Sequence, residues 1–323
     1  MRLAVILLAF GVSSCTWLDH RTDRSLAREL VERSKSGLAL AQIREGDLAL
    51  DIRFFDETHQ TRSLRDFSGV LAANTISRNR IVFASMPPNP VSLALHDTEA
   101  YLAALATYCG QIVELDMNAS VRARSEVCVD ASAIALSPNG ESIAFIGMPR
   151  GANLEARGLY LAKFHGTSVQ KRLDLPLASR DDLNTTTREV LEWMADDENL
   201  LLSRGGRVLV IDSKTGGLRE VVNAWAAQAS PMGTWITYLT ASYDAVLQNL
   251  ATGESRRLDP GKQVLSPIEW SPDGKYLLLH EGKGSHVPYG CWWVYRLSDS
   301  AFFPIPNYAQ GGPRPHWIEL GLR

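Results

Sequence analysis

The sequence predicts an all-β protein that folds as a ring of four-stranded sheets, because a unit of strand, turn and strand recurs along the chain. The two clearest copies are residues 191–202 and 268–279, each with a tight polar turn between two apolar strands. Weaker copies occupy residues 136–145 and 229–236. Corresponding positions lie about 36 residues apart (193 to 229) and about 41 apart (229 to 270), the spacing of propeller blades. We therefore predict a single closed β-propeller.

The recurring turn has a structural explanation. In Ser271-Pro272-Asp273-Gly274 the proline fixes φ at the second turn position, and the glycine tolerates the left-handed backbone that closes the turn. Calcium takes roughly six to eight oxygen ligands, which a lone carboxylate such as Asp273 cannot supply. The motif therefore predicts a turn, and we expect no metal site there.

The run Trp270-Ser271-Pro272-Asp273-Gly274-Lys275, followed by an apolar strand, resembles the repeat of TolB-type β-propellers. The same repeat occurs in the propeller domains of prolyl oligopeptidases. The resemblance extends over roughly residues 130 to 310, although Met194-Ala195-Asp196-Asp197 replaces Ser-Pro-Asp-Gly in one copy. It implies the propeller fold and, because TolB is a partner-binding periplasmic propeller, a protein-binding role. TolB-type proteins carry an additional N-terminal α/β domain, for which this chain has only about 30 residues, so we do not transfer TolB's specific role.

The number of blades follows from the expected strands and from how the ring closes. Residues 315–320 resemble a lone innermost strand, whose partners we expect at 47–55 and 61–64. Pairing the first and last strands in one blade covers their exposed edges and closes the ring. We predict six four-stranded blades with ring closure between the N- and C-terminal strands. Five and seven blades are the alternatives, because the N-terminal third is irregular. The clearest blades have strands at 268–270, 276–280, 291–297 and 302–305, and at 227–229, 235–239, 245–250 and 255–258.

The N-terminus has the pattern of an export signal. Met1 and Arg2 form a short basic region, and residues 3–12 are almost continuously apolar. This apolar stretch is much shorter than the roughly 20 residues that a membrane-spanning helix needs, so it predicts a cleaved signal peptide. The sequence Val12-Ser13-Ser14-Cys15 fits a bacterial lipobox, which predicts a lipoprotein signal peptide over 1–14. The alternative is an ordinary signal peptide with an incidental cysteine.

The resemblance to bacterial lipoproteins implies a thioether-linked diacylglycerol and an amide-linked acyl chain on Cys15. Several acyl chains together anchor a protein stably. Thr16 follows the cysteine where an Asp would stand in an inner-membrane lipoprotein of the enterobacterial type. This residue implies the periplasmic side of the outer membrane, with the inner membrane as the alternative.

The segment after the lipidated cysteine is expected to connect the anchor to the ring. We predict a tether over 15–45 and the propeller domain over 46–323. Within the tether, Ser25 could cap a short helix with Leu26, Leu30 and Val31 on one side, or the whole segment could be a disordered spacer.

Composition and cysteine usage agree with an exported globular body. Apolar residues make up 45% and charged residues 21%, and a net charge of −3 offers no basic field for nucleic acid. We expect a monomer. If 111–116 and 121–127 form a hairpin, Cys109 and Cys128 lie opposite each other and could form a disulfide in the periplasm. Cys291 is expected to be a buried thiol.

Motifs of catalysis and cofactor binding are missing from the sequence. It contains no Gly-x-Ser-x-Gly, no His-Glu-x-x-His, no Cys-x-x-Cys and no phosphate-binding glycine loop. Its seven histidines show no metal-ligand spacing. We therefore expect no catalytic residue, no metal and no cofactor, although a propeller can assemble a site from distant blades.

The longer loops between the second and third strands of each blade are the predicted binding surface. Arginine and tyrosine, which are enriched at interface hot spots, recur in these loops. The alternative is that each is an ordinary solvated residue. The predicted contacts are Arg150, Arg157, Arg204, Arg207, Tyr243, His286 and Tyr289.

These features predict a non-catalytic, membrane-anchored propeller that binds a protein partner in the periplasm of a bacterial envelope. One alternative is a binder of a peptide, a glycan or another small ligand in the central channel. The other is a propeller hydrolase or lactonase with its site at the channel mouth.

Overall fold

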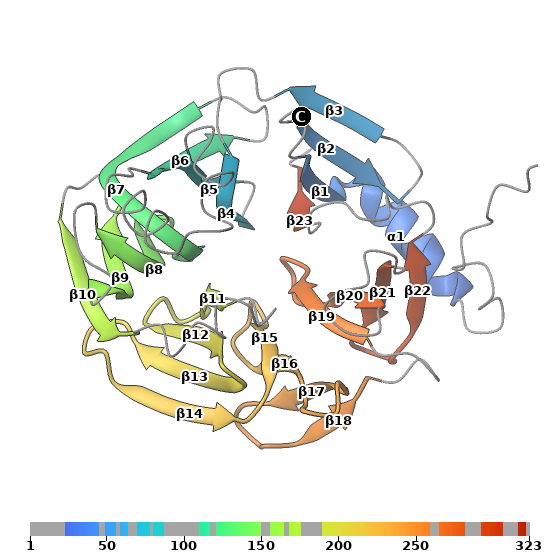
Figure 1. Ribbon diagram of the computed structural model, residues 1–323. Helices are drawn as coiled ribbons and strands as arrows, with labels where there is room; N and C mark the ends of the chain where they lie inside the picture. The colour runs from blue at the N-terminus through green and yellow to red at the C-terminus, as the bar shows by residue number, and fades with distance from the viewer. Residues whose placement is uncertain are drawn as a thin grey trace, which may run out of the picture.

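The described residues of the computed structural model form one helix and 23 strands, arranged as a ring of β-sheets (Figure 1). Each four-stranded sheet runs outward from an innermost strand near the axis of the ring, which confirms the all-β propeller. Among the described residues no helix has the length and apolar character needed to cross a membrane. The described residues are 23–44, 49–55, 59–63, 70–77, 80–86, 110–116, 121–149, 156–164, 168–175, 189–258, 265–281, 292–305 and 316–320.

The ring is closed by a sheet that combines both ends of the chain. Its order is β23-β1-β2-β3, and β23 pairs antiparallel with β1, with Leu40 opposite Trp317. The predicted closure is thus confirmed, but the direct partner of the C-terminal strand is a segment that we had assigned to the tether. The tether predicted over 15–45 is therefore wrong for residues 24–44, which belong to the folded body. The strands are β1 (Leu38–Arg44), β2 (Ala49–Phe54), β3 (His59–Ser63) and β23 (His316–Glu319).

The next sheet has seven strands, in the order β4-β5-β6-β7-β8-β9-β10. Its long strand β7 pairs with β6 through Val121–Val129 and with β8 through Val129–Leu136. The described strands consequently form five sheets, four of them four-stranded, and the prediction of six four-stranded blades is wrong. No turn sequence interrupts the 16 residues of β7, so strands expected for two blades form one sheet. The strands are β4 (Val70–Ser77), β5 (Arg80–Met86), β6 (Gly110–Asp116), β7 (Val121–Leu136), β8 (Ser142–Pro149), β9 (Gly158–Lys163) and β10 (Val169–Asp174).

The register of β6 and β7 bears on the predicted disulfide. In this register Cys128 lies opposite Gln111. Cys109 itself lies outside the described residues, as do Cys15 and Cys291. The disulfide between Cys109 and Cys128, the lipidation of Cys15 and the buried thiol of Cys291 stay predictions.

Three four-stranded sheets complete the ring, in the sequential orders β11 to β14, β15 to β18 and β19 to β22. The last two match the strands predicted from the repeat. Their bounds are β11 (Val190–Trp193), β12 (Asn199–Arg204), β13 (Arg207–Asp212), β14 (Leu218–Val222), β15 (Trp225–Ala229), β16 (Trp235–Leu239), β17 (Ala245–Asn249), β18 (Ser255–Arg257), β19 (Leu265–Trp270), β20 (Tyr276–Glu281), β21 (Trp292–Arg296) and β22 (Phe302–Ile305).

The repeated turn has the structural role that its sequence predicts. The Ser271 hydroxyl donates to Asp273 (2.8 Å) and accepts from the backbone N–H of Tyr276 (2.9 Å). Gly274 follows with a φ of 68°, the left-handed conformation that glycine adopts without strain. In the degraded copy Asp197 takes this position with a φ of 60°. Asp, like Asn, tolerates this backbone better than most residues, so the copy keeps its turn without the glycine.

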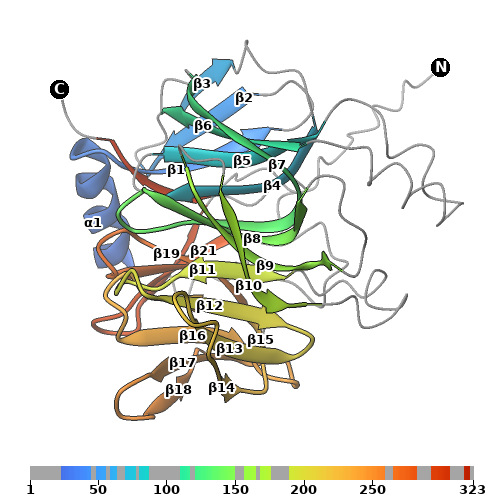
Figure 2. The same cartoon turned by 90° about the vertical axis from the view of Figure 1, so that its left-hand side faces the viewer.

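The helix α1 (Arg24–Lys35) precedes the first strand and packs against the last sheet (Figure 2). Its N-cap is Asp23, whose carboxylate accepts from the backbone N–H groups of Ser25 and Leu26, so the predicted cap at Ser25 is wrong. Leu26 and Leu30 are fully buried with Trp292 and Trp317, as the predicted helical face required. The residues before β1 are therefore part of the core.

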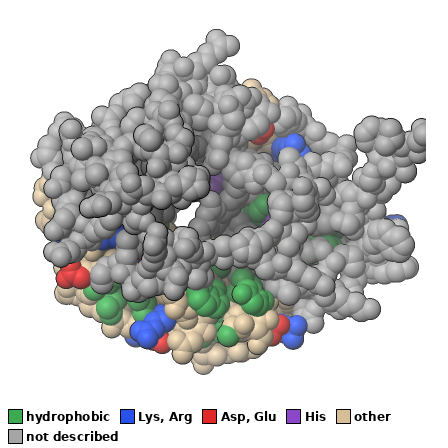
Figure 3. Space-filling view, in the orientation of Figure 1, with side chains coloured by type: hydrophobic (Ala, Val, Ile, Leu, Met, Phe, Trp, Pro, Cys, Tyr) green, Lys and Arg blue, Asp and Glu red, His purple; other side chains and the backbone are tan. Residues whose placement is uncertain are grey.

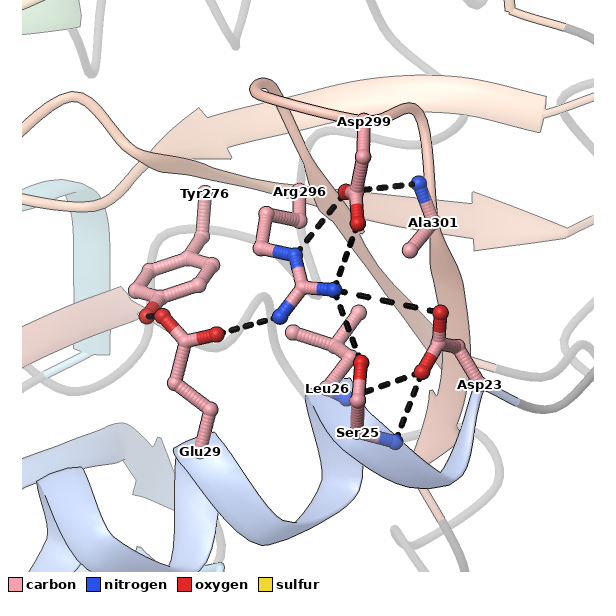
Figure 4. A network of polar contacts seen from close by, with 8 residues as sticks. All are labelled: Asp23, Ser25, Leu26, Glu29, Tyr276, Arg296, Asp299 and Ala301. Atoms are coloured by element: carbon pink, nitrogen blue, oxygen red, sulfur yellow. Dashed lines mark hydrogen bonds and ion pairs between the residues drawn. The ribbon is translucent and has the colours of Figure 1, made fainter.

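A network of polar contacts fastens α1 to the last sheet (Figure 4). The Arg296 guanidinium contacts Glu29 and lies 2.6 Å from Asp299, and its side chain is only 12% exposed. Glu29 also accepts a hydrogen bond from the Tyr276 hydroxyl. Hydrogen bonding to Asp299 raises the pKa of Arg296, and burial together with Glu29 raises the pKa of Tyr276, so both groups keep their protons across the physiological range.

Acid should weaken this attachment. The Arg296 hydrogen bond lowers the pKa of Asp299, and the Ser25 hydrogen bond lowers that of Asp23, both from 3.8. Since the folded-state pKa lies below the unfolded one, this stabilisation is complete above about pH 4 and is lost as the pH falls further. We expect the free energy of unfolding to fall below pH 4 and Asp299→Asn to make that fall shallower, as measured by urea unfolding at a series of pH values. An equally steep fall in Asp299→Asn would contradict the role of this carboxylate.

Candidate interaction surface

The strand connections divide between two faces of the ring. The turn face is formed by connections from the first to the second and from the third to the fourth strand of a sheet. It comprises residues 137–141, 194–198, 213–217, 230–234, 250–254, 271–275 and 297–301. The loop face is formed by the remaining connections, of which residues 156–157, 175, 189, 205–206, 223–224, 240–244 and 258 are described.

Four of the seven predicted contacts can be placed, and all four belong to the loop face. Arg157 directly precedes β9, Arg204 and Arg207 flank the turn between β12 and β13, and Tyr243 lies between β16 and β17. The structure separates them into a buried pair and an exposed pair. The other three, Arg150, His286 and Tyr289, lie outside the described residues and stay predictions.

The buried pair is Arg157 and Arg204, which share the carboxylate of Glu189. One Glu189 oxygen lies 2.6 Å from Arg157 Nη2, and the other lies 3.1 Å from Arg204 Nε. Arg157 also donates to the backbone carbonyl of Leu175 at the end of β10 (3.1 Å). The three charged side chains are only 10% to 18% exposed. This cluster joins the seven-stranded sheet to the sheet β11 to β14.

This arrangement corrects two of the predicted contacts. Arg157 was expected in an exposed loop, but its guanidinium is buried and bonded to Glu189. It therefore stabilises the packing of two sheets below the loop face. Arg204 has the same carboxylate partner and is mostly covered. Glu189 was missed altogether, because it stands 32 positions from Arg157 and no local spacing connects them. Arg157, Arg204 and Glu189 become neighbours only because the ring places two sheets side by side.

The exposed pair is Arg207 and Tyr243, on neighbouring sheets. The Arg207 side chain is 66% exposed and lies 3.9 Å from the carboxylate of Glu220. Tyr243 is 52% exposed and is one of four described residues other than glycine with positive φ, here 61°. Its backbone N–H donates to the Thr240 carbonyl (2.9 Å), and the Thr240 hydroxyl accepts from Asp244 N–H (3.1 Å). The turn thus holds a large aromatic side chain in solvent.

The strain at Tyr243 gives a prediction. A bulky residue with positive φ costs about 1 kcal/mol or more, a cost that glycine avoids. We expect Tyr243→Gly to leave the free energy of unfolding unchanged or to raise it by up to about 1 kcal/mol, as measured by urea unfolding. A clear loss of stability would show that the tyrosine is needed for folding and would weaken its assignment to binding.

The innermost strands are joined by a second set of polar contacts. Glu192 and Glu269 occupy equivalent positions of the two clearest repeats. Glu192 accepts from Ala229 N–H on β15 (2.8 Å), and Glu269 lies 2.8 Å from His316 Nδ1 on the closing strand β23. The ring has an opening at its centre (Figure 3). In the part of the chain that the structure describes, no group of three His, Cys, Asp or Glu residues could hold a metal ion.

A cleft of about 680 Å³ opens on the turn face between the sheets β11 to β14 and β15 to β18. It contains two carboxylates, and both are used by their own turns. Burial alone would raise the pKa of Asp196, but hydrogen bonds from Asn199 and Glu198 lower it overall. Hydrogen bonds from Thr215 lower the pKa of Asp212. The cleft therefore lacks uncommitted acids and is a weaker candidate than the loop face.

Solved structures of known proteins superimpose on this chain and share its fold. No protein-family model and no curated protein sequence matches the chain. TolB from Acinetobacter baumannii superimposes with a TM-score of 0.57 and 16% identity over 87% of this chain. A putative TolB from Agrobacterium tumefaciens gives a TM-score of 0.53 and 11% identity, also over 87% of this chain. The chain spans 66% of the first structure and 96% of the second. It therefore has the β-propeller fold seen in these TolB structures.

Proposed function

We propose that this protein is a non-catalytic, lipid-anchored propeller of the bacterial envelope that binds a protein partner through its loop face. The observation that carries the proposal is the exposed pair Arg207 and Tyr243, which are held on neighbouring rigid sheets. Arginine and tyrosine are residue types in which binding energy concentrates at protein interfaces. A propeller of TolB type fits such a protein-binding module.

Two features of the surface favour a protein over a small ligand. A small molecule needs a concave, mostly apolar site, whereas Arg207 and Tyr243 project from turns into solvent. In addition, positive φ in a bulky residue persists where the surrounding structure enforces it, and such strain clusters at functional positions. The backbone of Tyr243 is already held by its turn before a partner covers the side chain.

The location rests on the N-terminal sequence. The lipobox Val12-Ser13-Ser14-Cys15 supports lipidation of Cys15, and Thr16 supports delivery to the periplasmic side of the outer membrane. Export of the chain agrees with the periplasmic setting of TolB-type propellers. An envelope protein is then the expected partner.

In-cell crosslinking followed by mass spectrometry tests the proposal. We expect wild type to capture a specific envelope protein and the double variant Arg207→Glu, Tyr243→Ala to lose it. Loss of a hot-spot pair should weaken binding by about 2 kcal/mol or more, roughly thirtyfold. The matched control is Arg219→Glu, Met232→Ala, which makes the same kinds of change at exposed positions, Met232 being 71% exposed on the turn face.

The outcomes separate the competing functions. Equal loss in both double variants would show a non-specific effect and contradict the loop-face assignment. Capture that persists in both would remove Arg207 and Tyr243 from the proposal. If wild type captures no partner, the protein-binding proposal fails, and the channel between the innermost strands becomes the place to search for a small ligand or catalysis.

A further inference from the structure

The position of α1 on the ring has a consequence for how the protein sits on a membrane. Arg33 in α1 lies 2.7 Å from Asp273, in the turn that joins β19 to β20. Near the other end of the helix, Asp23 N–H donates to the carbonyl of Phe302, which follows the turn between β21 and β22 (3.2 Å). Both turns belong to the turn face. The helix therefore covers the turn face of the last sheet (Figure 2).

The attachment of α1 is apolar as well as polar. Leu26 and Leu30 are 0% exposed and share a core cluster with Trp292 and Trp317. The burial of these two leucine side chains stabilises the attachment, and Arg296 adds its contacts to Glu29 and Asp299. The chain is thus fixed to the ring from Asp23 onward. Only the residues between Cys15 and Asp23 are left to span the distance between the membrane and the ring.

Those residues have a short reach. Eight peptide steps separate Cys15 from Asp23, which at roughly 3.3 to 3.6 Å per residue is at most about 29 Å of fully extended chain. A six-residue strand such as β20 alone spans about 20 Å from the turn face to the loop face, before the connections at either end are added. Placing the loop face on a membrane would require nearly complete extension of this segment along the side of the ring, at a large cost in conformational entropy.

We infer that α1 orients the anchored propeller, with the turn face toward the membrane that holds Cys15 and the loop face turned away from it. This inference rests on the proposed lipidation of Cys15. The partner is then a protein that approaches from the periplasmic space, or from the opposite membrane, rather than a neighbour lying flat on the same bilayer. The cleft and the exposed Met232 on the turn face lie on the membrane side.

Energy transfer to the membrane tests the orientation. A donor dye is attached by way of p-azidophenylalanine in place of Met232 on the turn face or Ser242 on the loop face, both exposed and on the same sheet. The full lipidated protein is reconstituted in vesicles that contain a rhodamine-labelled lipid as acceptor. Because β16 separates the two positions by about 17 Å, we expect transfer from position 232 to be about twofold or more greater than from 242. Equal transfer, or more from 242, overturns the inference.

A variant tests the role of α1 in the orientation, and a mass measurement tests the lipidation of Cys15. Leu30→Asp should release α1 from the ring and reduce the difference between the two donors, provided that circular dichroism shows an intact propeller. A difference that persists in this folded variant would overturn the role of α1. The mass of the N-terminal peptide reports lipidation independently. An unmodified Cys15 overturns the proposed anchoring itself, whereas a lipidated Cys15 with equal transfer overturns only the orientation.

Discussion

Trp317→Ala is expected to lower the free energy of unfolding by about 3 to 5 kcal/mol, the usual range for truncating a buried tryptophan. Trp317 is 2% exposed on β23, the strand that closes the ring. Its ring centroid lies 5.6 Å from that of Phe55 and 6.0 Å from that of Tyr276. The substitution therefore leaves a cavity where the closing sheet, the last sheet and α1 meet.

Urea unfolding at constant pH would measure this loss, with Met232→Ala as the control. Met232 is 71% exposed, so its truncation should change the free energy of unfolding by no more than about 0.5 kcal/mol. If Trp317→Ala cost less than about 1 kcal/mol, the packing at the ring closure described here would be wrong.

The closure also depends on the close approach of the backbone at Gly37 and Leu320. A Cβ on Gly37, whose φ is 100°, would lie 1.8 Å from the Leu320 carbonyl oxygen.

The sequence predicts the sheets well wherever the turn repeat is present. Ser271 and its counterparts fix a turn through local hydrogen bonds, so the flanking strands follow from a few neighbouring residues. Strand β1 has no such turn before it, because the chain enters it from α1. Its short alternating run of leucine and alanine became recognisable only through pairing with β23, nearly 280 residues away. The long strand β7 was misjudged for a related reason, since no turn residue marks where one blade would end.

The candidate site was predicted in outline and not in detail. Arg207 and Tyr243 lie on the loop face and are exposed there, as the prediction requires, and their role in binding stays a prediction. Exposure could not be predicted for Arg157 and Arg204, because it depends on a carboxylate from another connection. Whether an arginine binds a partner or an internal acid is decided by the packing between sheets, and a single sequence does not display that packing.

Because Glu189 is the internal acid that Arg157 and Arg204 share, we expect its removal to cause the second large loss of stability. Removing one member of a buried ion pair costs about 3 to 5 kcal/mol, because the remaining charge loses its partner while staying out of water. Glu189→Ala would remove the carboxylate that two guanidinium groups, 10% and 18% exposed, share. We expect a loss of about 3 kcal/mol or more in the free energy of unfolding, measured by urea unfolding.

The matched control is Glu220→Ala, which removes the acid of the solvent-exposed ion pair between Arg207 and Glu220. That pair is 3.9 Å apart with side chains 66% and 44% exposed, so its loss should cost no more than about 0.5 kcal/mol. Similar small losses in both variants would show that the Glu189 cluster is solvated and would restore Arg157 and Arg204 as candidate contacts. A large loss confined to Glu189→Ala would instead mean that these two arginines hold the seven-stranded sheet to its neighbour. Partner recognition would then fall to the residues that this scaffold presents, Arg207 and Tyr243 among them.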